Sequence, residues 1–333
     1  MFVYIDKTVG IYLQNNKLLQ WQLDIFDNLA YGIRNGTCIV RGNRDSLMLL
    51  GRNSYLNRVN YIGISQEVDL LMLAEYVNRV FVIGFEVLAE SDSVPQCIVN
   101  KVSYIYLDEK YKYLNDGCTF EACSLVCEDL NDIAFLKILC RSYIGKYHIN
   151  SYEANFSCDQ GGGERTGEVF RLKVVDENKF SLCIVDSDKK YEYQKEYGQT
   201  CRLACEVYEQ LKVQGLHGKC ELYILACHEI ENMTPLSIVN EMAKEKKYKL
   251  EPQVVRLLNS IKEFGDPKPL LYFDIKNGTN KIKDEQCREY WDCVINNALK
   301  SNRKDISFPG FGNHFLQKVI SNSGVYFLST PKA

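Results

Sequence analysis

The sequence SLCIVDSDKK, residues 181–190, passes directly from a short apolar run into two aspartates and two lysines. The run 182–185 is typical of a β-strand that is covered by other elements on both faces. Asp186 and Asp188 stand two positions apart, so an extended backbone would point both side chains to the same side. A solvated turn or a metal site would each explain two carboxylates at the end of a buried strand.

The composition is that of a soluble globular protein. Of the 333 residues, 46% are hydrophobic and 25% are charged, and the net charge is −3. A chain of this length accommodates two or three domains, each with its own core. A surface for nucleic acid would have to be a local patch, because the chain as a whole is not basic. The sequence contains no apolar run of about 18 residues, so no transmembrane helix is expected. The first residues lack the pattern of a signal peptide, so we expect a cytoplasmic protein.

Fourteen cysteines are scattered along the chain, several of them inside apolar runs, and no two form a CxxC pair. Zinc sites usually use cysteines at short paired spacing. The densest group, Cys118, Cys123 and Cys127, does not have that spacing. We therefore interpret the cysteines as reduced, apolar residues rather than as zinc ligands.

Two parts of the chain have different patterns. Residues 1–115 contain short β-type runs separated by turns and one helical pattern at 68–80, which predicts an N-terminal mixed α+β domain. Residues 116–333 begin with alternating strands and helices and become mainly helical from about residue 232. Strands are expected at 123–127, 146–152, 181–185, 220–227 and 269–278. The alternation predicts an α/β domain with a mostly parallel sheet flanked by helices on both faces.

Acidic side chains follow three of the first four strands of this second part. They are Glu128, Asp129 and Asp132 after the first strand, Asp186 and Asp188 after the third, and Glu229 and Glu231, next to His228, after the fourth. Ligands of open α/β sheets bind at the carboxyl ends of the strands. Carboxylates crowded at that edge would raise one another's pKa values, and a hard dication such as Mg²⁺ would relieve the repulsion.

Four segments in this order resemble motifs of Toprim domains, and most closely those of the OLD-type (overcoming lysogenization defect) nucleases. SLVCEDLNDIAFLKIL (124–139) resembles a strand that ends in glutamate, with an aspartate four residues later. The glycines 161–163 stand where many Toprim nucleases have a glycine-rich loop. CIVDSDKKY (183–191) resembles the Toprim aspartate pair, and ILACHEIENMTP (224–235) is similar to the segment R-E-I-E-N-Y. A faint further similarity to a glycine-lysine segment lies in FPGFGNHFLQKVI (308–320).

The resemblance implies a Toprim-like fold and a metal-dependent nuclease that hydrolyses phosphodiesters of DNA or, as the weaker expectation, of RNA. The metal ion that it implies is Mg²⁺ or Mn²⁺. Glu231 is preferred to Glu229 on the resemblance alone. The implied metal ligands are Glu128, Asp132, Asp186, Asp188 and Glu231. Among these, Glu128, Asp186 and Asp188 are implied to be catalytic, with Glu128 as general base.

The resemblance also implies partners. OLD-type proteins contain an ATPase, but the sequence has no Walker loop (GxxxxGK[ST]), so an ATPase would have to be a separate subunit. The implied role is in bacterial anti-phage defence. Residues 1–115 would then bind a partner or the substrate, and 116–333 would form the Toprim-like catalytic domain with a helical C-terminal extension. A homo-oligomer remains open, and no membrane association is expected.

Two other functions remain open. The chain could be a non-catalytic Toprim-like subunit that binds nucleic acid or a protein partner. Two departures from the family pattern favour this alternative. No glycine follows Glu128, and Asn313 and His314 stand in place of the lysine of the family segment. The weaker alternative is a phosphoryl-transfer enzyme with Asp186 as nucleophile, whose usual D-x-D-x-T pattern fails at position 190.

Ordinary structural roles compete with each of these functional interpretations. The carboxylates could be turn residues or acids that stabilise a helix N-terminus. His228 and His314 could be catalytic, but a lone histidine is more often structural. Lys189 and Lys190 could contact phosphate oxygens or only balance the neighbouring acids.

Overall fold

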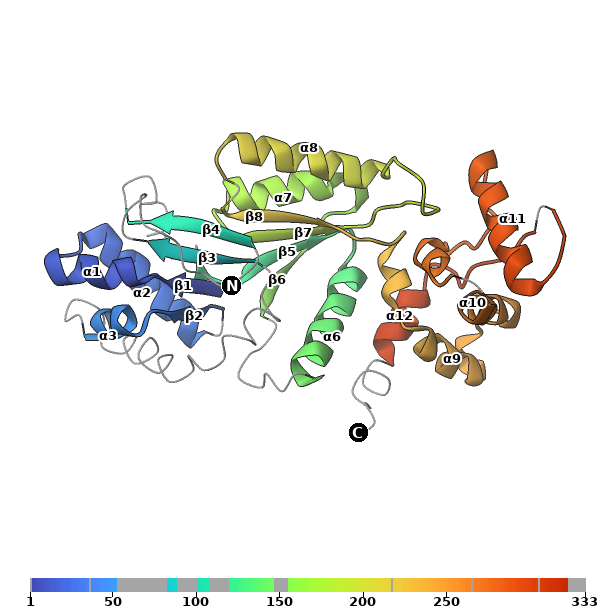
Figure 1. Cartoon of the computed structure of the whole chain (residues 1–333), viewed down its shortest axis with the longest axis horizontal. Helices are drawn as coiled ribbons and strands as arrows, with labels where there is room; N and C mark the ends of the chain where they lie inside the picture. The colour runs from blue at the N-terminus through green and yellow to red at the C-terminus, as the bar shows by residue number, and fades with distance from the viewer. Residues whose placement is uncertain are drawn as a thin grey trace.

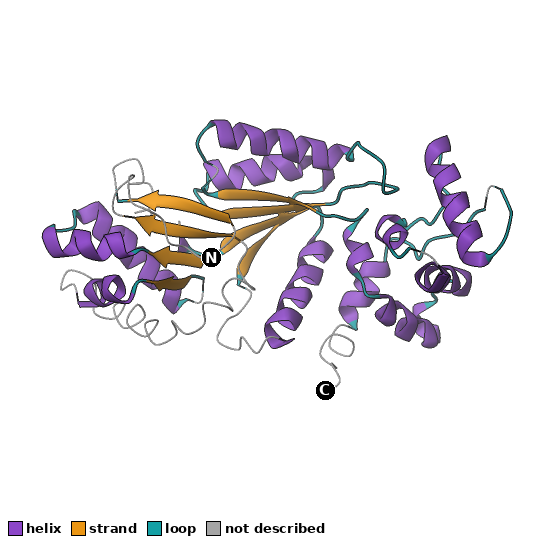
Figure 2. Ribbon diagram, viewed as in Figure 1, coloured by secondary structure: helices purple, strands orange, loops and turns teal. Residues whose placement is uncertain are grey.

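The computed structural model describes residues 2–35, 37–52, 83–88, 101–107, 120–146, 155–216, 218–264, 266–304 and 306–322. Within these residues the strands form two four-stranded sheets, and every strand pairing is parallel. Helices flank the sheets (Figures 1 and 2). The protein is therefore an α/β protein, as the alternation of strand and helix patterns predicts.

The N-terminal sheet has the strand order β2–β1–β3–β4. Its strands are β1 (Phe2–Ile5), β2 (Ile39–Gly42), β3 (Ile83–Leu88) and β4 (Lys101–Tyr106). The helices described with it are α1 (Lys7–Asn15), α2 (Gln20–Arg34) and α3 (Arg44–Arg52). Parallel neighbours need a crossover connection, and α1 and α2 supply it between β1 and β2. The expected mixed α+β pattern is thus wrong for the described strands, while the helix expected at 68–80 lies outside the described residues.

The C-terminal sheet has the order β6–β5–β7–β8. Its strands are β5 (Cys123–Cys127), β6 (Phe156–Gln160), β7 (Ser181–Val185) and β8 (Cys220–Ile224). Its helices are α6 (Leu130–Lys146), α7 (Thr166–Val175) and α8 (Gln199–Val213). Figure 1 shows α7 and α8 on one face of this sheet and α6 on the other. The predicted parallel sheet with helices on both faces is confirmed.

Strand β7 explains why its sequence is apolar throughout. Cys183 and Val185 belong to the buried cluster under α7 and α8, whereas Leu182 and Ile184 pack against the core cluster on the opposite face. Alternate residues of a strand point to opposite faces, so a strand covered on both sides needs apolar residues at every position. The strand ends at Val185, directly before the first aspartate.

The remaining helices form the C-terminal extension. They are α9 (Leu236–Lys244), α10 (Pro252–Phe264), α11 (Glu285–Leu299) and α12 (Phe315–Ser321), with short 3-10 helices η4 (Gly163–Arg165), η5 (Ile230–Met233), η6 (Lys246–Tyr248) and η7 (Lys268–Tyr272). Figure 1 places α9 to α12 beyond the carboxyl ends of β5 to β8. Their buried side chains share one core cluster with β5 and α6, so the extension packs directly on the sheet domain.

Two expected strands of the second part differ from the structure. The strand that follows β5 in the chain and pairs with it is β6 (Phe156–Gln160). It lies later in the chain than the expected 146–152, most of which lies outside the described residues. The strand expected at 269–278 is wrong, because η7 and a turn occupy these residues. Asp274 forms this turn by accepting a hydrogen bond from the backbone N–H of Asn277 (2.7 Å), which is a common turn-forming contact of aspartate.

Packing joins the two sheets across the expected domain boundary at residues 115 and 116. The rings of Phe120 and Phe180 lie 6.3 Å apart, and both side chains belong to the core cluster of the N-terminal sheet. The Thr37 hydroxyl donates a hydrogen bond to the backbone oxygen of Phe120 (2.7 Å). None of the helices within the described ranges has the length and apolar character needed to cross a bilayer.

Replacing Phe170 by alanine should lower the free energy of unfolding by about 3–5 kcal/mol, because its ring is fully buried between α7 and the sheet and its loss leaves a cavity. Val175, on the same helix, is 38% exposed, so Val175→Ala should change the stability by no more than about 0.5 kcal/mol. Urea denaturation of both variants measures the difference. Equal losses for the two variants would contradict the packing described for α7.

Candidate functional site

The acidic side chains predicted from the sequence gather at the carboxyl end of the C-terminal sheet. The five predicted metal ligands all lie here: Glu128 directly after β5, Asp132 in the first turn of α6, Asp186 and Asp188 after β7, and Glu231 in η5. Their electrostatic coupling shows that they are neighbours. The pKa of Asp186 is raised to about 9, first by burial and then by the charges of four other carboxylates. Those four are Glu128, Asp132, Glu229 and Glu231.

Three hydrogen bonds join the turn after β7 to the segment after β8. Asp186 Oδ1 accepts from the backbone N–H of Ile230 (2.9 Å). The buried Ser187 hydroxyl donates to the backbone oxygen of Cys227 (2.6 Å). The backbone N–H of Asp188 donates to the backbone oxygen of His228 (2.9 Å). These bonds bring the acids of the third strand next to those of the fourth.

Asp188 reaches this edge by a different backbone path from the one predicted. Its φ is +54°, in the left-handed region, so Asp186 and Asp188 do not leave an extended strand with period-two geometry. Gly198 lies against the Asp188 side chain, and a Cβ at position 198 would overlap Asp188 Oδ2. A glycine is therefore required at the start of α8 for Asp188 to occupy this place.

Glu128 is a partly buried carboxylate with an unsatisfied oxygen. Its pKa is raised to about 7, by burial first and then by the charges of Asp188 and Asp132. Its Oε1 is buried without a hydrogen-bond partner. A buried carboxylate oxygen in that state is costly unless a cation or water satisfies it.

Asp132 has both a structural contact and a place among the acids. Its Oδ2 accepts a hydrogen bond from the backbone N–H of Asp129 (2.9 Å) at the start of α6. Burial raises its pKa to about 7, the Asp129 N–H opposes this, and the charge of Glu231 adds to it. Asp132 therefore serves as a helix-start acid and as a neighbour of the other carboxylates.

Lys276 lies among these carboxylates, although no sequence pattern predicts it there. Its Nζ is 3.2 Å from Glu229 Oε2 and 3.2 Å from Glu231 Oε1. Burial lowers the pKa of Lys276, but the charges of Glu231 and Glu229 outweigh this and hold it above its ordinary value. Glu231 is 3% exposed, and its second oxygen has no hydrogen-bond partner. The apolar pattern of 269–278 predicts a strand, and a single lysine within such a pattern does not indicate a site.

The segment 308–320, which faintly resembles a glycine-lysine motif, holds the backbone of Lys276 in place. It does not itself supply the lysine of the site. The backbone N–H of Gly312 donates to the backbone oxygen of Lys276 (3.0 Å). Gly310 lies so close that a Cβ would overlap the same oxygen. His314, at the position expected for the family lysine, is exposed and contacts Gln317.

The glycine-rich loop is used to hold the turn after β5. The N–H groups of Gly161 and Gly162 donate to the backbone oxygens of Cys127 (2.7 Å) and Glu128 (3.0 Å). These two N–H groups are therefore engaged within the chain. Their contribution is to fix the backbone that carries Glu128.

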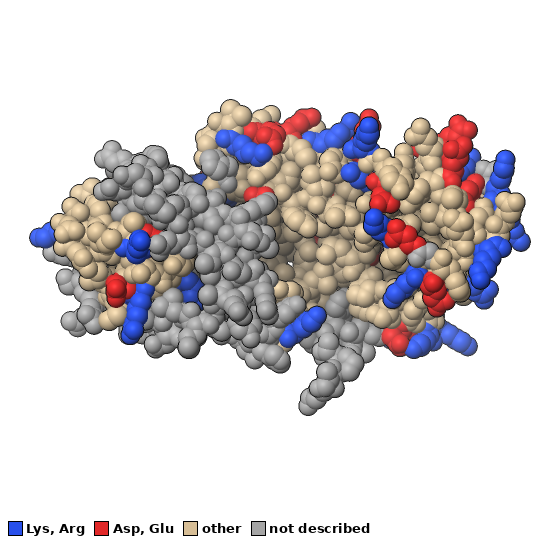
Figure 3. Space-filling view, viewed as in Figure 1, with Lys and Arg blue, Asp and Glu red and all other residues tan. Residues whose placement is uncertain are grey.

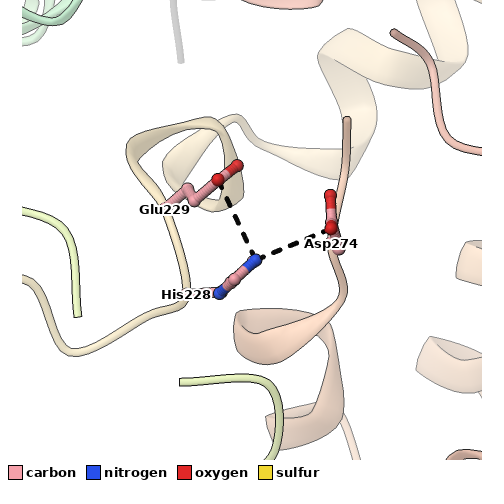
Figure 4. A group of neighbouring side chains, drawn as sticks. All are labelled: His228, Glu229 and Asp274. Carbon is pink, nitrogen blue, oxygen red and sulfur yellow. Dashed lines mark ion pairs between the residues drawn. The ribbon is translucent and has the colours of Figure 1, made fainter. Parts of the chain in front are cut away.

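His228 lies between two carboxylates at the same edge (Figure 4). Its Nε2 is 4.0 Å from Glu229 Oε1 and 3.9 Å from Asp274 Oδ2. Burial lowers the pKa of His228, but the two carboxylates outweigh it and the net pKa is raised. The pKa of Asp274 is lowered, because His228 and Asn277 outweigh the effect of burial. Asp274 was not predicted, since the strand expected there would not have turned it toward His228.

The donor set at this edge fits a divalent cation. Carboxylate oxygens are the ligands that Mg²⁺ and Mn²⁺ prefer, and the unpartnered oxygens of Glu128 and Glu231 are free to accept one. The five predicted ligands would have to draw closer together, however. Within the described part of the chain, the only group of three or more His, Cys, Asp or Glu side chains whose ligand atoms all lie within 4.8 Å of one another is His228, Glu229 and Asp274.

Comparisons of the chain with family models, with curated proteins and with solved structures found no match.

The metal-free protein should lose stability as the pH rises through the neutral range. The folded-state pKa values of Glu128 and Asp132 are raised to about 7 and that of Asp186 to about 9. Between its ordinary and its raised pKa, each group holds a proton in the folded state that the unfolded chain has released. The folded state then binds more protons, and the free energy of unfolding falls with increasing pH. Thermal melts in chelator across this interval measure the effect.

The variant Asp186→Asn isolates this effect. Its amide oxygen can still accept the Ile230 hydrogen bond, but it removes an acid that the folded state disfavours in its charged form. Near pH 8 in chelator we expect a gain of about 1 kcal/mol, or roughly 2–4 °C in melting temperature. Asp176→Asn, at an exposed carboxylate after α7, is the matched control and should show no gain. A melting temperature of Asp186→Asn below that of the wild type would contradict the crowding of carboxylates.

Proposed function

We propose that the protein is a metal-dependent nuclease that hydrolyses nucleic-acid phosphodiesters at the carboxyl end of its C-terminal sheet. The observation that carries the proposal is the convergence of acids from the ends of three neighbouring strands, β5, β7 and β8. Burial and the charges of nearby carboxylates raise the pKa values of Glu128, Asp132 and Asp186 there. Such perturbed groups are concentrated at functional sites. The resemblance of four segments to Toprim nucleases supports the same chemistry.

Mg²⁺ or Mn²⁺ would be held by Glu128, Asp132, Asp186, Asp188 and Glu231. When bound there, the ion would act as a Lewis acid toward the phosphoryl group and make its water more acidic. Glu128 and Glu231 each have one buried oxygen without a hydrogen-bond partner, which supports this assignment. The raised pKa of Asp186 supports it as well, because a dication would restore the charged carboxylate.

The chain itself would supply a base and a fixed positive charge. Glu128, with a pKa of about 7, can accept a proton from an attacking water near neutral pH, where general bases are most effective. Lys276 carries three N–H donors, and its side chain is 28% exposed. It contacts Glu229 and Glu231 and keeps the capacity to donate to a phosphate oxygen.

The substrate is proposed to be DNA rather than RNA, on the resemblance. Figure 3 shows lysine and arginine side chains interspersed with acidic ones over the C-terminal helices on the face in view. A nucleic acid would therefore meet local cations there rather than one broad basic surface. The loop between β7 and α8 contributes Lys189, Lys190 and an exposed aromatic side chain, Tyr193 (72% exposed).

The biological role that we propose is that of a Toprim-like effector in bacterial anti-phage defence that works with a separate ATPase. This rests on the resemblance of residues 118–235 and on the absence of a Walker loop from the sequence. Residues 1–115 would bind the partner or the substrate, and 116–333 would carry out catalysis. A cytoplasmic location is part of the same proposal.

A second candidate is a non-catalytic Toprim-like subunit that binds nucleic acid or a protein. One observation favours it: Lys276 already places a positive charge between two of the carboxylates. An internal cation compensates part of the repulsion, so the shape of this edge could persist without catalysis.

Cleavage assays separate the two candidates. Plasmid, single-stranded DNA and RNA are incubated with the wild type, Glu128→Gln and Asp186→Asn, with Mg²⁺, with Mn²⁺ and with chelator. We expect metal-dependent cleavage by the wild type and a loss of at least about 10²-fold in both variants. Glu168→Gln, at an exposed glutamate of α7, should cleave as the wild type does.

Undiminished cleavage by both Glu128→Gln and Asp186→Asn would exclude the proposed site. Binding of nucleic acid without cleavage, by the wild type and under every metal condition, would instead support the non-catalytic subunit. Circular dichroism and thermal melts of each variant show that a loss of cleavage is not a loss of fold.

A further inference from the structure

We propose that His228, Glu229 and Asp274 form a second metal site, which binds a dication of the Zn²⁺ class. None of the three residues belongs to the five carboxylates proposed for the nuclease, although the two sites are neighbours at the same edge of the sheet. Each residue offers one ligand atom, and these three atoms all lie within 4.8 Å of one another. The carboxylate oxygens paired with His228 Nε2 are Glu229 Oε1 and Asp274 Oδ2. Figure 4 shows the imidazole directed into the space between the two carboxylates.

The state of His228 points to a missing ligand. The side chain is only 3% exposed, and neither ring nitrogen has a hydrogen-bond partner. A buried polar group without a partner costs about 1–3 kcal/mol, so such groups are rare and call for an explanation such as an ion. A metal ion on Nε2 would supply the interaction that this nitrogen lacks.

The distances around Nε2 suit an ion better than hydrogen bonds. Nε2 is 4.0 Å from Glu229 Oε1 and 3.9 Å from Asp274 Oδ2, beyond the range of a direct N–H···O bond. Zinc ligands lie about 2.0–2.2 Å from the ion. Two ligands of one ion can therefore be separated by at most about 4.2 Å, and both distances fall within this limit.

The other atoms of the three ligands are already held in place. Asp274 Oδ1 accepts from the Asn277 backbone N–H (2.7 Å), and Glu229 Oε2 lies 3.2 Å from Lys276 Nζ. The backbone N–H of His228 donates to Leu271 (2.7 Å), and its backbone oxygen accepts from Asp188 (2.9 Å). Such outer contacts orient metal ligands and are a usual part of metal sites.

The mixture of donors selects the class of ion. Imidazole nitrogen suits Zn²⁺ and its neighbours in the first transition row, whereas Mg²⁺ prefers oxygen ligands alone. Three protein ligands also leave a fourth position of the zinc coordination sphere for water, as in zinc sites that do chemistry. The competing explanation is a protonated His228 that pairs with both carboxylates, without any metal.

Cobalt binding tests the site directly, since Co²⁺ substitutes for Zn²⁺ and its visible absorption reports on bound ligands. The full chain is stripped with chelator, dialysed and titrated with Co²⁺, and Zn²⁺ is then added as competitor. We expect one tightly bound Co²⁺ per chain that Zn²⁺ displaces and that an excess of Mg²⁺ does not. His228→Gln and Asp274→Asn should each weaken binding by at least about 10-fold.

Asp274→Asn is the second variant because its amide oxygen can keep the Asn277 hydrogen bond, so the turn and the fold are retained. Asp176→Asn, at an exposed carboxylate after α7, is the control and should bind Co²⁺ as the wild type does. Equal Co²⁺ affinity in the wild type and both site variants would overturn the proposal. Loss of binding in Asp186→Asn with full binding in His228→Gln would do the same, because the ion would then belong to the carboxylates.

This readout does not depend on the proposed nuclease activity. A protein that cleaves nothing can still show the expected Co²⁺ site. Conversely, a nuclease with Mg²⁺-dependent activity can lack one.

Discussion

The contacts between the turn after β7 and the segment after β8 are the constraint on which the acidic edge depends. Asp186, Ser187 and Asp188 each donate or accept one hydrogen bond across this gap. The bonds hold carboxylates from neighbouring strands together although their charges repel. Because these hydrogen bonds hold like charges close together, the edge needs a positive charge or protons to offset the repulsion.

Two kinds of compensation are built into the chain, and a third would come from outside it. Raised pKa values let Glu128, Asp132 and Asp186 hold protons, and Lys276 places a cation between Glu229 and Glu231. A dication would replace the protons and leave the carboxylates charged. The balance between protons, lysine and metal sets how much negative charge the edge carries.

The C-terminal extension completes the site rather than merely covering it. The turn after η7 supplies Asp274 and Lys276, and the glycines 310 and 312 allow a second segment to support the backbone of that turn. This segment continues into α12, which packs against α6, the helix that carries Asp132. The acids of the sheet and the groups that oppose their charge are thus held by the same C-terminal core.

The sequence by itself determined the alternation of strands and helices after residue 116. It also determined the acids at the strand ends, because the short apolar runs and the order βαβ show where the strands of a parallel sheet end. It placed β5 and β7 correctly, and with them Glu128 and Asp186. Only the tertiary structure decided the rest. The helices between β1 and β2 let these two strands pair in parallel, and Asp188 reaches the edge through a left-handed turn. Asp274 and Lys276 lie in a turn whose local sequence pattern predicts a strand. They contact residues about 50 positions earlier in the chain, and such a contact leaves no periodic signal in either segment.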